Sequence, residues 1–311
     1  MAKILITESV HPIGPELLTA AGHTVVYANR DMDVIRREIV DADAVLVRII
    51  ELPGSLLATA KNLKIVSKHG VGYDNIDLDY CKSHGIAVPI TPNANSLSVA
   101  EHAFTLMLTL AKNIIPVSNE YRTVGFAAKN HAPGIEMTGK TLGLIGMGRI
   151  GKHILHMCRD GLDMHVIVYD PYISEVPEGV ERVDDLSELL RRADVVTLHC
   201  LLTDETRKLI DRERLALMKP TALLINCARG PIVDEAALIE ALENGRLAGA
   251  GLDVTDPEPV APDSPLFKLP NVIVTPHYAP TTVESATRVS KIAAENINAV
   301  LAGQEPVGRI V

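Results

Sequence analysis

The chain has 311 residues, a length that predicts about two domains and leaves enough residues for a sizeable buried core. Apolar residues make up 47% and charged residues 22%, so the composition is that of a globular protein and not of a disordered one. The formal net charge of -9 makes nucleic acid and anionic membrane surfaces poor partners. No apolar stretch reaches the roughly 20 residues that a membrane-spanning helix needs, and the N-terminal segment predicts a strand rather than a secretory signal.

The four cysteines, Cys81, Cys158, Cys200 and Cys227, form no CxxC pair, and no group of histidines accompanies them. This spacing gives no sign of a zinc site, so we expect no metal. Reduced thiols are typical of proteins of the cytosol, and we expect a cytoplasmic protein.

Short apolar runs rich in β-branched residues recur along the first hundred residues, with helical stretches between them. These runs are KILIT at 3–7, TVVYA at 24–28, AVLV at 44–47, KIVS at 64–67 and IAV at 86–88. Alternation of this kind predicts βαβ units and a parallel sheet.

A second series of such runs begins after residue 140. Its members occupy 141–146, 165–170, 195–200, 222–227, 249–254 and 271–276. Six strands is the number of a complete doubly wound dinucleotide-binding domain.

Two predicted helices define the domain organisation. A helix over 96–114, with Glu101 three residues after Ser98 as in a capping box, joins the two series of strands. The last helix, 282–301, follows a completed sheet, so we expect it to return to the first domain. The sequence therefore predicts an α/β protein with a Rossmann, doubly wound domain at 96–281 and a discontinuous, flavodoxin-like domain at 1–95 and 282–311.

A GxGxxG motif, Gly146-Met147-Gly148-Arg149-Ile150-Gly151, lies between the predicted strand TLGLI and a helical run. In a dinucleotide fingerprint the first glycine permits the tight turn. The second lets backbone N–H groups approach a pyrophosphate at the helix N-terminus, and the third allows close packing of helix on strand.

Asp170 ends the next strand, about 20 residues beyond the last glycine of the motif, where an acidic residue binds the ribose of the adenosine. A carboxylate at that position repels a 2′-phosphate and favours NAD over NADP. The alternative interpretation is that Asp170 only caps the Asp-Pro turn that follows. Strand, motif, helix and acid together favour the dinucleotide interpretation.

Arg229, Glu258 and His277 each follow a predicted strand of the second series. Ligands bind beyond the carboxyl ends of the strands in open α/β sheets, so these side chains can converge. Arginine can hold the carboxylate and carbonyl oxygens of a 2-hydroxy acid, and histidine can remove the hydroxyl proton as hydride leaves for a nicotinamide ring. Glu258 would orient the imidazole and stabilise its protonated form. Singly, each residue also has a plainer interpretation, as a surface arginine, a solvated loop acid or a turn histidine.

Several segments resemble the D-isomer-specific 2-hydroxy acid dehydrogenases. They are HGVGYDNID (69–77), TPNANSLSVAEH (91–102), GKTLGLIGMGRIGK (139–152), YDP (169–171), LHCLLTDETRKLI (198–210), NCARGPIVDEAAL (226–238), AGAGLDVTDPEP (248–259), PLFKLPNVIVTPH (265–277) and AAENINAVLAG (293–303). The resemblance extends over nearly the whole chain, and it keeps Arg, Glu and His in the family's order.

The resemblance implies NAD as cofactor and a small 2-hydroxy or 2-keto acid as substrate. Besides the motif glycines, it implies NAD contacts from Arg149, Ile150, Asp170, Cys200, Cys227, Arg229 and Asp253, with Asp253 near the nicotinamide carboxamide. It implies Arg229, Glu258 and His277 as the catalytic residues, and Lys68, His69, Gly70, Val71 and Gly72 as a substrate loop in the discontinuous, substrate-binding domain. Asn93 and Asn95 match a segment at the domain hinge.

Within the family, the segments TPNANSLSVAE and YDPYISEV are most similar to 3-phosphoglycerate dehydrogenases. Those enzymes often carry arginine where this chain has Lys68, which keeps the charge and loses the bidentate fork. Lys68 is therefore either a second cationic contact for a phosphorylated acid, or a residue that points to solvent or pairs with Asp74. Other departures are Leu201 for a usual proline, and Ala279-Pro280 where glycine-rich residues are common.

The sequence predicts an NAD-dependent oxidoreductase, with D-3-phosphoglycerate as one candidate substrate. Its alternatives are a hydroxypyruvate or glyoxylate reductase and an NAD(H)-sensing, corepressor-like binding protein. We expect a short form without an appended serine-sensing domain, and the resemblance implies a homodimer formed through the nucleotide-binding domains.

Overall fold

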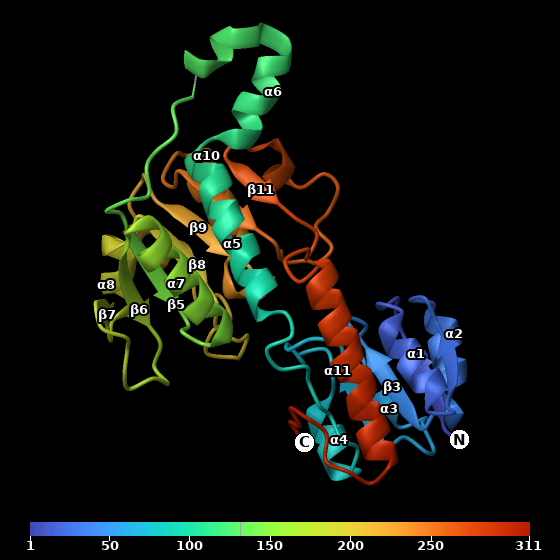
Figure 1. Cartoon of the computed structure of the whole chain (residues 1–311). Coiled ribbons are helices and arrows are strands. Elements are labelled where there is room, and N and C mark those ends of the chain that lie inside the picture. The colour runs from blue at the N-terminus through green and yellow to red at the C-terminus, as the bar shows by residue number, and fades with distance from the viewer. Residues whose placement is uncertain (131) are drawn as a thin grey trace. The chain divides into compact units, whose positions relative to one another are not determined.

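The structure, a computed structural model, describes residues 1–130 and 132–311 (Figure 1). The chain divides into two compact units. The first unit contains residues 1–95 and 280–311, and the second unit contains residues 96–279.

The first unit is built on a four-stranded parallel sheet with the order β2-β1-β3-β4, the order in which a flavodoxin-like sheet begins. Its strands are β1 (Lys3–Ile6), β2 (Thr24–Tyr27), β3 (Ala44–Val47) and β4 (Ile65–Lys68). Its helices are α1 (Ile13–Ala20), α2 (Met32–Glu38), η1 (Ile39–Asp41), α3 (Gly54–Leu57), α4 (Leu78–Ser83) and α11 (Val283–Leu301). Helices cover both faces, so β3 and β4 are buried along their whole length.

Helix α11, the last of the chain, packs on α1 and β4 of the first unit. The Ser67 hydroxyl donates a hydrogen bond to the carbonyl of Ala293 at 2.9 Å, and the Ser290 hydroxyl donates to the carbonyl of His11 at 2.7 Å. Ala293 and Ile297 are fully buried in the same core as Ile4. The closing helix thus completes the core of the first unit.

The fifth strand predicted for this unit, at 86–88, is wrong as a regular strand. Ala87 forms only an isolated bridge with Ile65 of β4, and Pro89 forms another with Arg309. The apolar pattern is real, because Ile86 and Val88 are buried, but the paired segment is too short to extend the sheet.

The second unit contains a seven-stranded parallel sheet with the order β11-β10-β9-β8-β5-β6-β7. Its strands are β5 (Thr141–Ile145), β6 (His165–Tyr169), β7 (Val180–Arg182), β8 (Val195–Leu198), β9 (Leu223–Asn226), β10 (Gly249–Leu252) and β11 (Val272–Val274). The strand order reverses between β5 and β8, which is the switch point of a Rossmann sheet. The predicted α/β architecture is confirmed, with β7 as a seventh strand that the sequence analysis did not include.

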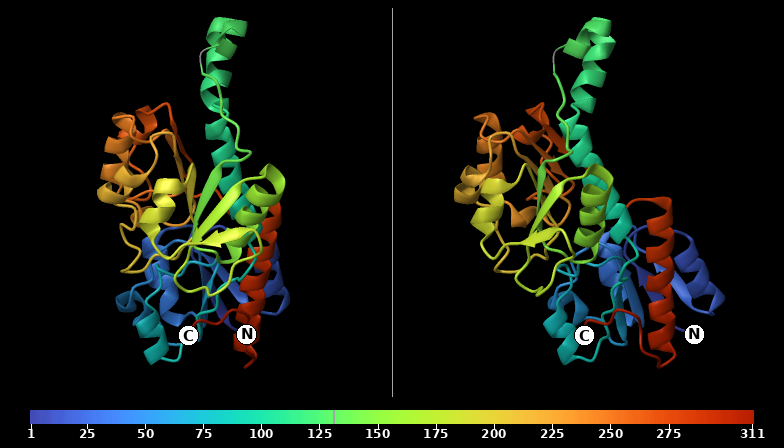
Figure 2. Two further views of the ribbon diagram at one scale, coloured as in Figure 1. Left: turned by 90° about the vertical axis from the view of Figure 1, so that its left-hand side faces the viewer. Right: turned by 60° about the vertical axis from the view of Figure 1, so that its left-hand side comes forward.

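Helices cover both faces of this sheet as well (Figure 2). They are α5 (Ser96–Ala111), α6 (Ile114–Val124), η2 (Gly125–Asn130), α7 (Arg149–Leu162), α8 (Leu186–Arg192), α9 (Arg212–Leu217), η3 (Gly230–Ile232), α10 (Glu235–Glu243) and η4 (Pro265–Lys268). Helices α5 and α7 enclose one core, and α8, α9 and α10 enclose the other. The helix predicted over 96–114 ends at Ala111, because Asn113 adopts a left-handed conformation with φ of 50° before α6 begins.

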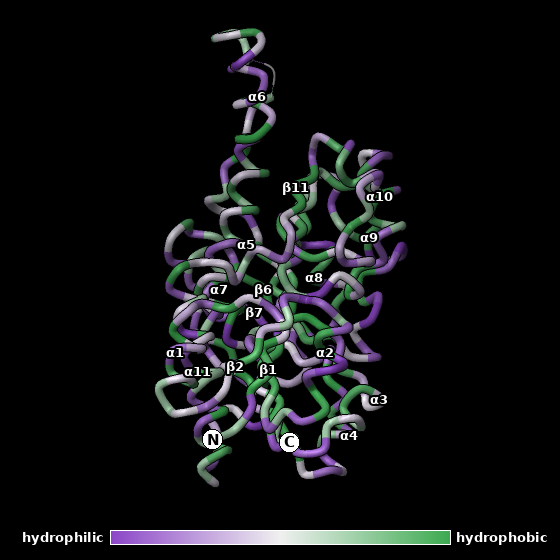
Figure 3. Tube along the Cα trace, turned by 90° about the vertical axis from the view of Figure 1, so that its right-hand side faces the viewer, coloured by the Kyte–Doolittle hydropathy of each residue, from purple (hydrophilic) through white to green (hydrophobic). Residues whose placement is uncertain are grey.

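The hydropathy of the chain follows this layering (Figure 3). Strands β8, β9 and β10 are buried at every position, as expected for parallel strands that are covered on both faces. Within the described residues, none of the helices combines the length and the apolarity needed to cross a membrane.

Candidate active site

The glycine motif forms the turn between β5 and α7, at the switch point of the sheet. Gly146 has a φ of +89°, and a Cβ on it would lie 2.8 Å from the backbone nitrogen of Cys200. A Cβ on Gly151 would lie 2.3 Å from the carbonyl oxygen of Gly146, so the helix packs directly on the turn. At Gly148, the N-cap of α7, nothing lies within 4 Å of an added Cβ. The turn therefore fits a pyrophosphate at the helix N-terminus.

Asp170 ends β6 beside this turn. Its carboxylate accepts hydrogen bonds from the backbone nitrogen of Met147 at 2.9 Å and from that of Tyr172 at 3.0 Å. Asp170 thus caps the turn that follows it, as the alternative interpretation required, and it also holds the glycine turn. A carboxylate has about four acceptor sites, so these two bonds leave capacity for ribose hydroxyls. Its ribose contact stays a prediction.

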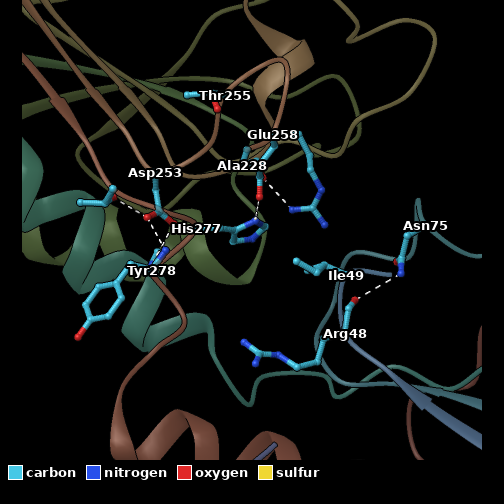
Figure 4. A network of polar contacts seen from close by, with 12 residues as sticks. Arg48, Ile49, Asn75, Ala228, Asp253, Thr255, Glu258, His277 and Tyr278 are labelled. Atoms are coloured by element: carbon cyan, nitrogen blue, oxygen red, sulfur yellow. Dashed lines mark hydrogen bonds and ion pairs between the residues drawn. The ribbon is translucent and has the colours of Figure 1, made fainter. Parts of the chain in front are cut away.

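Arg229, Glu258 and His277 lie in the loops that follow β9, β10 and β11, three neighbouring parallel strands. The carboxyl ends of these three strands therefore meet at one edge of the second unit's sheet. The Nδ1 atom of His277 lies 2.6 Å from Oε1 of Glu258, and Figure 4 shows the imidazole directed at this carboxylate. Because a carboxylate only accepts, Nδ1 carries the hydrogen, and Nε2 is left for proton exchange with a substrate.

The backbone of His277 is in the left-handed region, with a φ of 52°. Its N–H group donates to the carbonyl of Asp253 at 2.8 Å and to that of Thr275 at 3.0 Å. The His277 and Glu258 side chains are 29% and 36% exposed, so the pair stays open to a substrate while its backbone is fixed.

Arg229 begins the turn after β9. Asn226 donates through Nδ2 to the Arg229 carbonyl at 2.9 Å, and the Arg229 guanidinium donates to the carbonyl of Ala228 at 2.8 Å. A Cβ on the next residue, Gly230, would lie only 1.9 Å from the carbonyl oxygen of Thr255. The turn that carries Arg229 is therefore packed directly on the loop that leads to Glu258.

Asp253 lies beneath the His277 loop, with a side chain that is 1% exposed. Its carboxylate accepts from the Thr275 hydroxyl at 2.6 Å, from the Tyr278 nitrogen at 2.7 Å and from the Ala279 nitrogen at 2.9 Å. The sequence analysis missed this structural role, since the partners lie more than 20 positions away in the sequence. The contact with a nicotinamide carboxamide stays a prediction.

Cys200 and Cys227 follow β8 and β9 at the same edge of the sheet. Burial raises the pKa of Cys200 to about 11, and it raises the pKa of Cys227 well above its ordinary value. Both are therefore neutral thiols at physiological pH, which suits van der Waals contact with a cofactor and not nucleophilic chemistry. The residues that the structure describes contain no cluster of histidine, cysteine and acidic side chains that could hold a metal ion.

The predicted substrate loop belongs to the first unit and begins at the end of β4. Lys68 is only 6% exposed, so the interpretation that it points to solvent is wrong. Its ammonium group donates to the carbonyl of Arg48 and to Oδ1 of Asn75. Burial, together with the charge of Arg48, lowers the pKa of His69 to about 3, so this imidazole is neutral at physiological pH. Lys68 thus supports the loop that carries Arg48.

Arg48 is a candidate substrate contact that the sequence analysis missed. It follows β3, and its backbone nitrogen and that of Ile49 donate to the carboxylate of Glu8 at 2.7 and 2.9 Å. Glu8 follows β1 and is 2% exposed. The sequence did contain a signal for this pair. Arg48 follows β3 directly and Glu8 lies two residues after β1, and these two strands are neighbours in the sheet.

Comparison with known proteins identifies the family. Residues 104–279 match the family model described as "D-isomer specific 2-hydroxyacid dehydrogenase, NAD binding domain". The D-3-phosphoglycerate dehydrogenase of Methanocaldococcus jannaschii is 42% identical over 308 residues, which are 98% of this chain and 58% of that protein. The chain belongs to the D-isomer specific 2-hydroxyacid dehydrogenase family. The resemblance noted in the sequence is confirmed, and the residues that match the family's NAD-binding domain lie within the second unit.

Other members of the family are similar over their whole length. The glyoxylate reductase of Thermofilum pendens is 38% identical over 319 residues, covering 98% of this chain and 93% of that protein. The crystal structure of the D-lactate dehydrogenase of Aquifex aeolicus, complexed with NAD and lactic acid, has a TM-score of 0.88 and 33% identity, and 96% of each chain is covered. By contrast, the chain spans little more than half the length of the M. jannaschii relative.

Proposed function

We propose that the protein is an NAD-dependent dehydrogenase that interconverts a small D-2-hydroxy acid and its 2-keto acid. The observation that carries the proposal is the pairing of His277 with Glu258 at 2.6 Å, at the same sheet edge as the Arg229 turn. The dinucleotide turn of Gly146 to Gly151 lies in the same unit, and its open N-cap fits the cofactor.

NAD, when bound, supplies the hydride acceptor for oxidation of the hydroxy acid. His277 takes the hydroxyl proton at Nε2, and Glu258 stabilises the resulting imidazolium through Nδ1. Arg229 holds the substrate carboxylate and the C2 oxygen through its planar fork. In the reverse direction, the imidazolium returns the proton to the C2 oxygen, and Arg229 stabilises the charge that develops there.

We propose that residues 68–72, through their backbone, and Arg48 contribute substrate contacts from the first unit. D-3-phosphoglycerate is one candidate, given the M. jannaschii relative. Lys68 gives the phosphorylated substrate little support, since the Lys68 ammonium group donates hydrogen bonds to the Arg48 carbonyl and to Asn75. Reduction of glyoxylate or hydroxypyruvate is the second candidate, favoured by the T. pendens relative that this chain nearly covers. Steady-state rates with 3-phosphoglycerate and NAD, and with glyoxylate and hydroxypyruvate and NADH, rank these substrates.

Asp170 predicts a preference for NAD over NADP. Placing its charge beside a 2′-phosphate costs several kcal/mol, so kcat/KM for NADH exceeds that for NADPH by about 10²-fold. Asp170→Asn removes the charge and keeps one of the two oxygens that accept from the Met147 and Tyr172 amides. We expect it to narrow the ratio of NADH to NADPH efficiency, mainly through better use of NADPH. Equal use of both cofactors by the wild type would remove Asp170 as the determinant.

Glu258→Gln tests the role of the carboxylate through the pH profile. Glutamine can still accept the hydrogen bond from Nδ1 but does not stabilise the imidazolium, so the neutral base is reached at lower pH. The acid limb of the profile of hydroxy acid oxidation therefore moves to lower pH. An unchanged profile would reduce Glu258 to a loop acid.

We propose that the protein is a homodimer, with α6 and η2 at the interface. Helix α6 contains no buried residue and exposes Ile114, Tyr121 and Val124, while Phe126 of η2 is 73% exposed. Figure 2 shows α6 extending away from the sheet of the second unit. An isolated helix of 11 residues is marginal in water, so this apolar surface needs a partner.

Light scattering coupled to gel filtration tests this proposal. The wild type elutes as a dimer of the 33.5 kDa chain, and Tyr121→Glu with Phe126→Glu shifts it toward the monomer. A wild type that stays monomeric at all concentrations would contradict the proposal.

A further inference from the structure

A chain of polar contacts connects helix α5 to the loop that presents His277. Nε2 of His102, on α5, lies 3.0 Å from the hydroxyl of Thr275 and 3.5 Å from the carboxylate of Asp253. The Thr275 hydroxyl is 2.6 Å from the same carboxylate oxygen of Asp253. That oxygen also accepts from the backbone nitrogen of Tyr278, the residue after His277. All of these residues belong to the second unit.

The direction of these hydrogen bonds follows from the chemistry of the groups. A threonine hydroxyl has one hydrogen, and a carboxylate can only accept, so Thr275 donates to Asp253. The Thr275 oxygen must then accept from His102, which requires the hydrogen on Nε2 of that imidazole. His102 therefore acts as a donor whether its ring is neutral or protonated. Its side chain is 17% exposed, which limits competition from water.

This chain ends on backbone that needs external support. His277 is held at a φ of 52°, a conformation that non-glycine residues adopt only when their surroundings fix it. The fixing contacts are few: the carbonyls of Asp253 and Thr275 accept from the His277 nitrogen, and the Asp253 carboxylate accepts from the next two nitrogens. Figure 4 shows Asp253 close to His277 and Tyr278 at the base of this loop.

We propose that His102 is a positioning residue, which orients Thr275 and Asp253 by its Nε2 hydrogen bond and thereby fixes the loop that presents His277. This inference rests on the proposed function, since positioning matters only if His277 handles the proton. No direct contact of His102 with a substrate or cofactor is invoked. The required group is an N–H donor at the place of Nε2, so the test is whether a different side chain with that donor can replace histidine.

Two matched pairs of variants test the proposal. His102→Gln places an amide N–H donor near the position of Nε2, whereas His102→Leu removes it at similar volume. Thr275→Ser keeps the hydroxyl, whereas Thr275→Val replaces it with a methyl group of the same shape. For each variant we would measure kcat and KM with NADH and the best 2-keto acid. Amide hydrogen exchange of residues 278 and 279 would be measured on the same samples without substrate.

His102→Leu and Thr275→Val are expected to lower kcat about 10- to 100-fold, the effect of a small misplacement of a catalytic group, while KM for NADH changes little. Exchange at 278 and 279 becomes faster in both variants, because the loop opens more often. His102→Gln and Thr275→Ser restore most of the kcat and the protection. A purely structural role would lower the melting temperature of both histidine variants without separating Gln from Leu in kcat.

The proposal is overturned if His102→Leu keeps wild-type kcat and exchange, or if Gln is as impaired as Leu. Should His102→Leu fail to fold, His102→Gln decides alone: a folded Gln variant that loses kcat and the protection of 278 and 279 overturns the proposal. Absence of turnover in the wild type would refute the proposed function instead, and the exchange data would still show whether His102 holds the loop.

Discussion

His277→Asn lowers kcat for 2-keto acid reduction by at least about 10²-fold, the lower limit of what a positioned acid–base group contributes. Asparagine is a matched replacement, because it tolerates the φ of 52° and its amide can still donate to Glu258. What it lacks is the second nitrogen that exchanges the proton. The effect therefore reports proton transfer and not collapse of the loop.

The control for this variant is cofactor binding. NADH titrated into His277→Asn, followed by its fluorescence, should give a Kd close to that of the wild type, since the glycine turn lies beyond β5 and not beyond β11. Near-normal turnover in this variant would remove His277 from the mechanism.

Gly230→Ala abolishes most activity by a different route. Its Cβ would lie 1.9 Å from the carbonyl oxygen of Thr255 and 2.9 Å from the nitrogen of Asp256, so the loops after β9 and β10 must separate. Arg229 and Glu258 are carried by these two loops. We expect kcat/KM to fall by at least about 10²-fold, because the catalytic groups are displaced, and stability to fall by about 1–3 kcal/mol through overpacking.

Gly161→Ala is the matched control for this substitution. Gly161 lies within α7, and nothing lies within 4 Å of an added Cβ. Alanine there should raise stability by up to about 1 kcal/mol and leave kcat unchanged. Wild-type activity and unfolding midpoint in Gly230→Ala would show that the two loops are not packed as described.

Much of the fold was predictable because parallel strands that are buried on both faces give continuous apolar runs, as in β3, β8 and β9. Strand β7 lacks that signal. It is a three-residue edge strand, Val180–Arg182, with two exposed charged residues. Helix α6 also lacks that signal, because it contains no buried residue, and its Pro116 is tolerated because it lies in the first turn of the helix.

The candidate site was predictable where local sequence determines geometry. The glycine turn is such a case, since φ at Gly146 and the packing of Gly151 are set within six residues. The networks around Asp253 and Glu8 were not predictable, because each joins segments that only the tertiary fold brings together. Lys68 illustrates the same limit: its charge was evident, but its bonds to Arg48 and Asn75 depend on the packing of β3 against β4.

Transfer of deuterium from the cofactor to a 2-keto acid tests the proposed dehydrogenase activity most directly. The wild-type protein would be incubated with NADH that carries deuterium at both C4 positions of the nicotinamide, and with glyoxylate, hydroxypyruvate and pyruvate in turn. Each product would be analysed by NMR and chiral chromatography. We expect NADH to be oxidised, with deuterium at C2 of the product in equal amount. Glycerate from hydroxypyruvate and lactate from pyruvate are expected to have the D configuration. NADH that binds but is not consumed with any of these acids or with phosphohydroxypyruvate would contradict the proposed activity and indicate a nucleotide-binding protein without dehydrogenase activity.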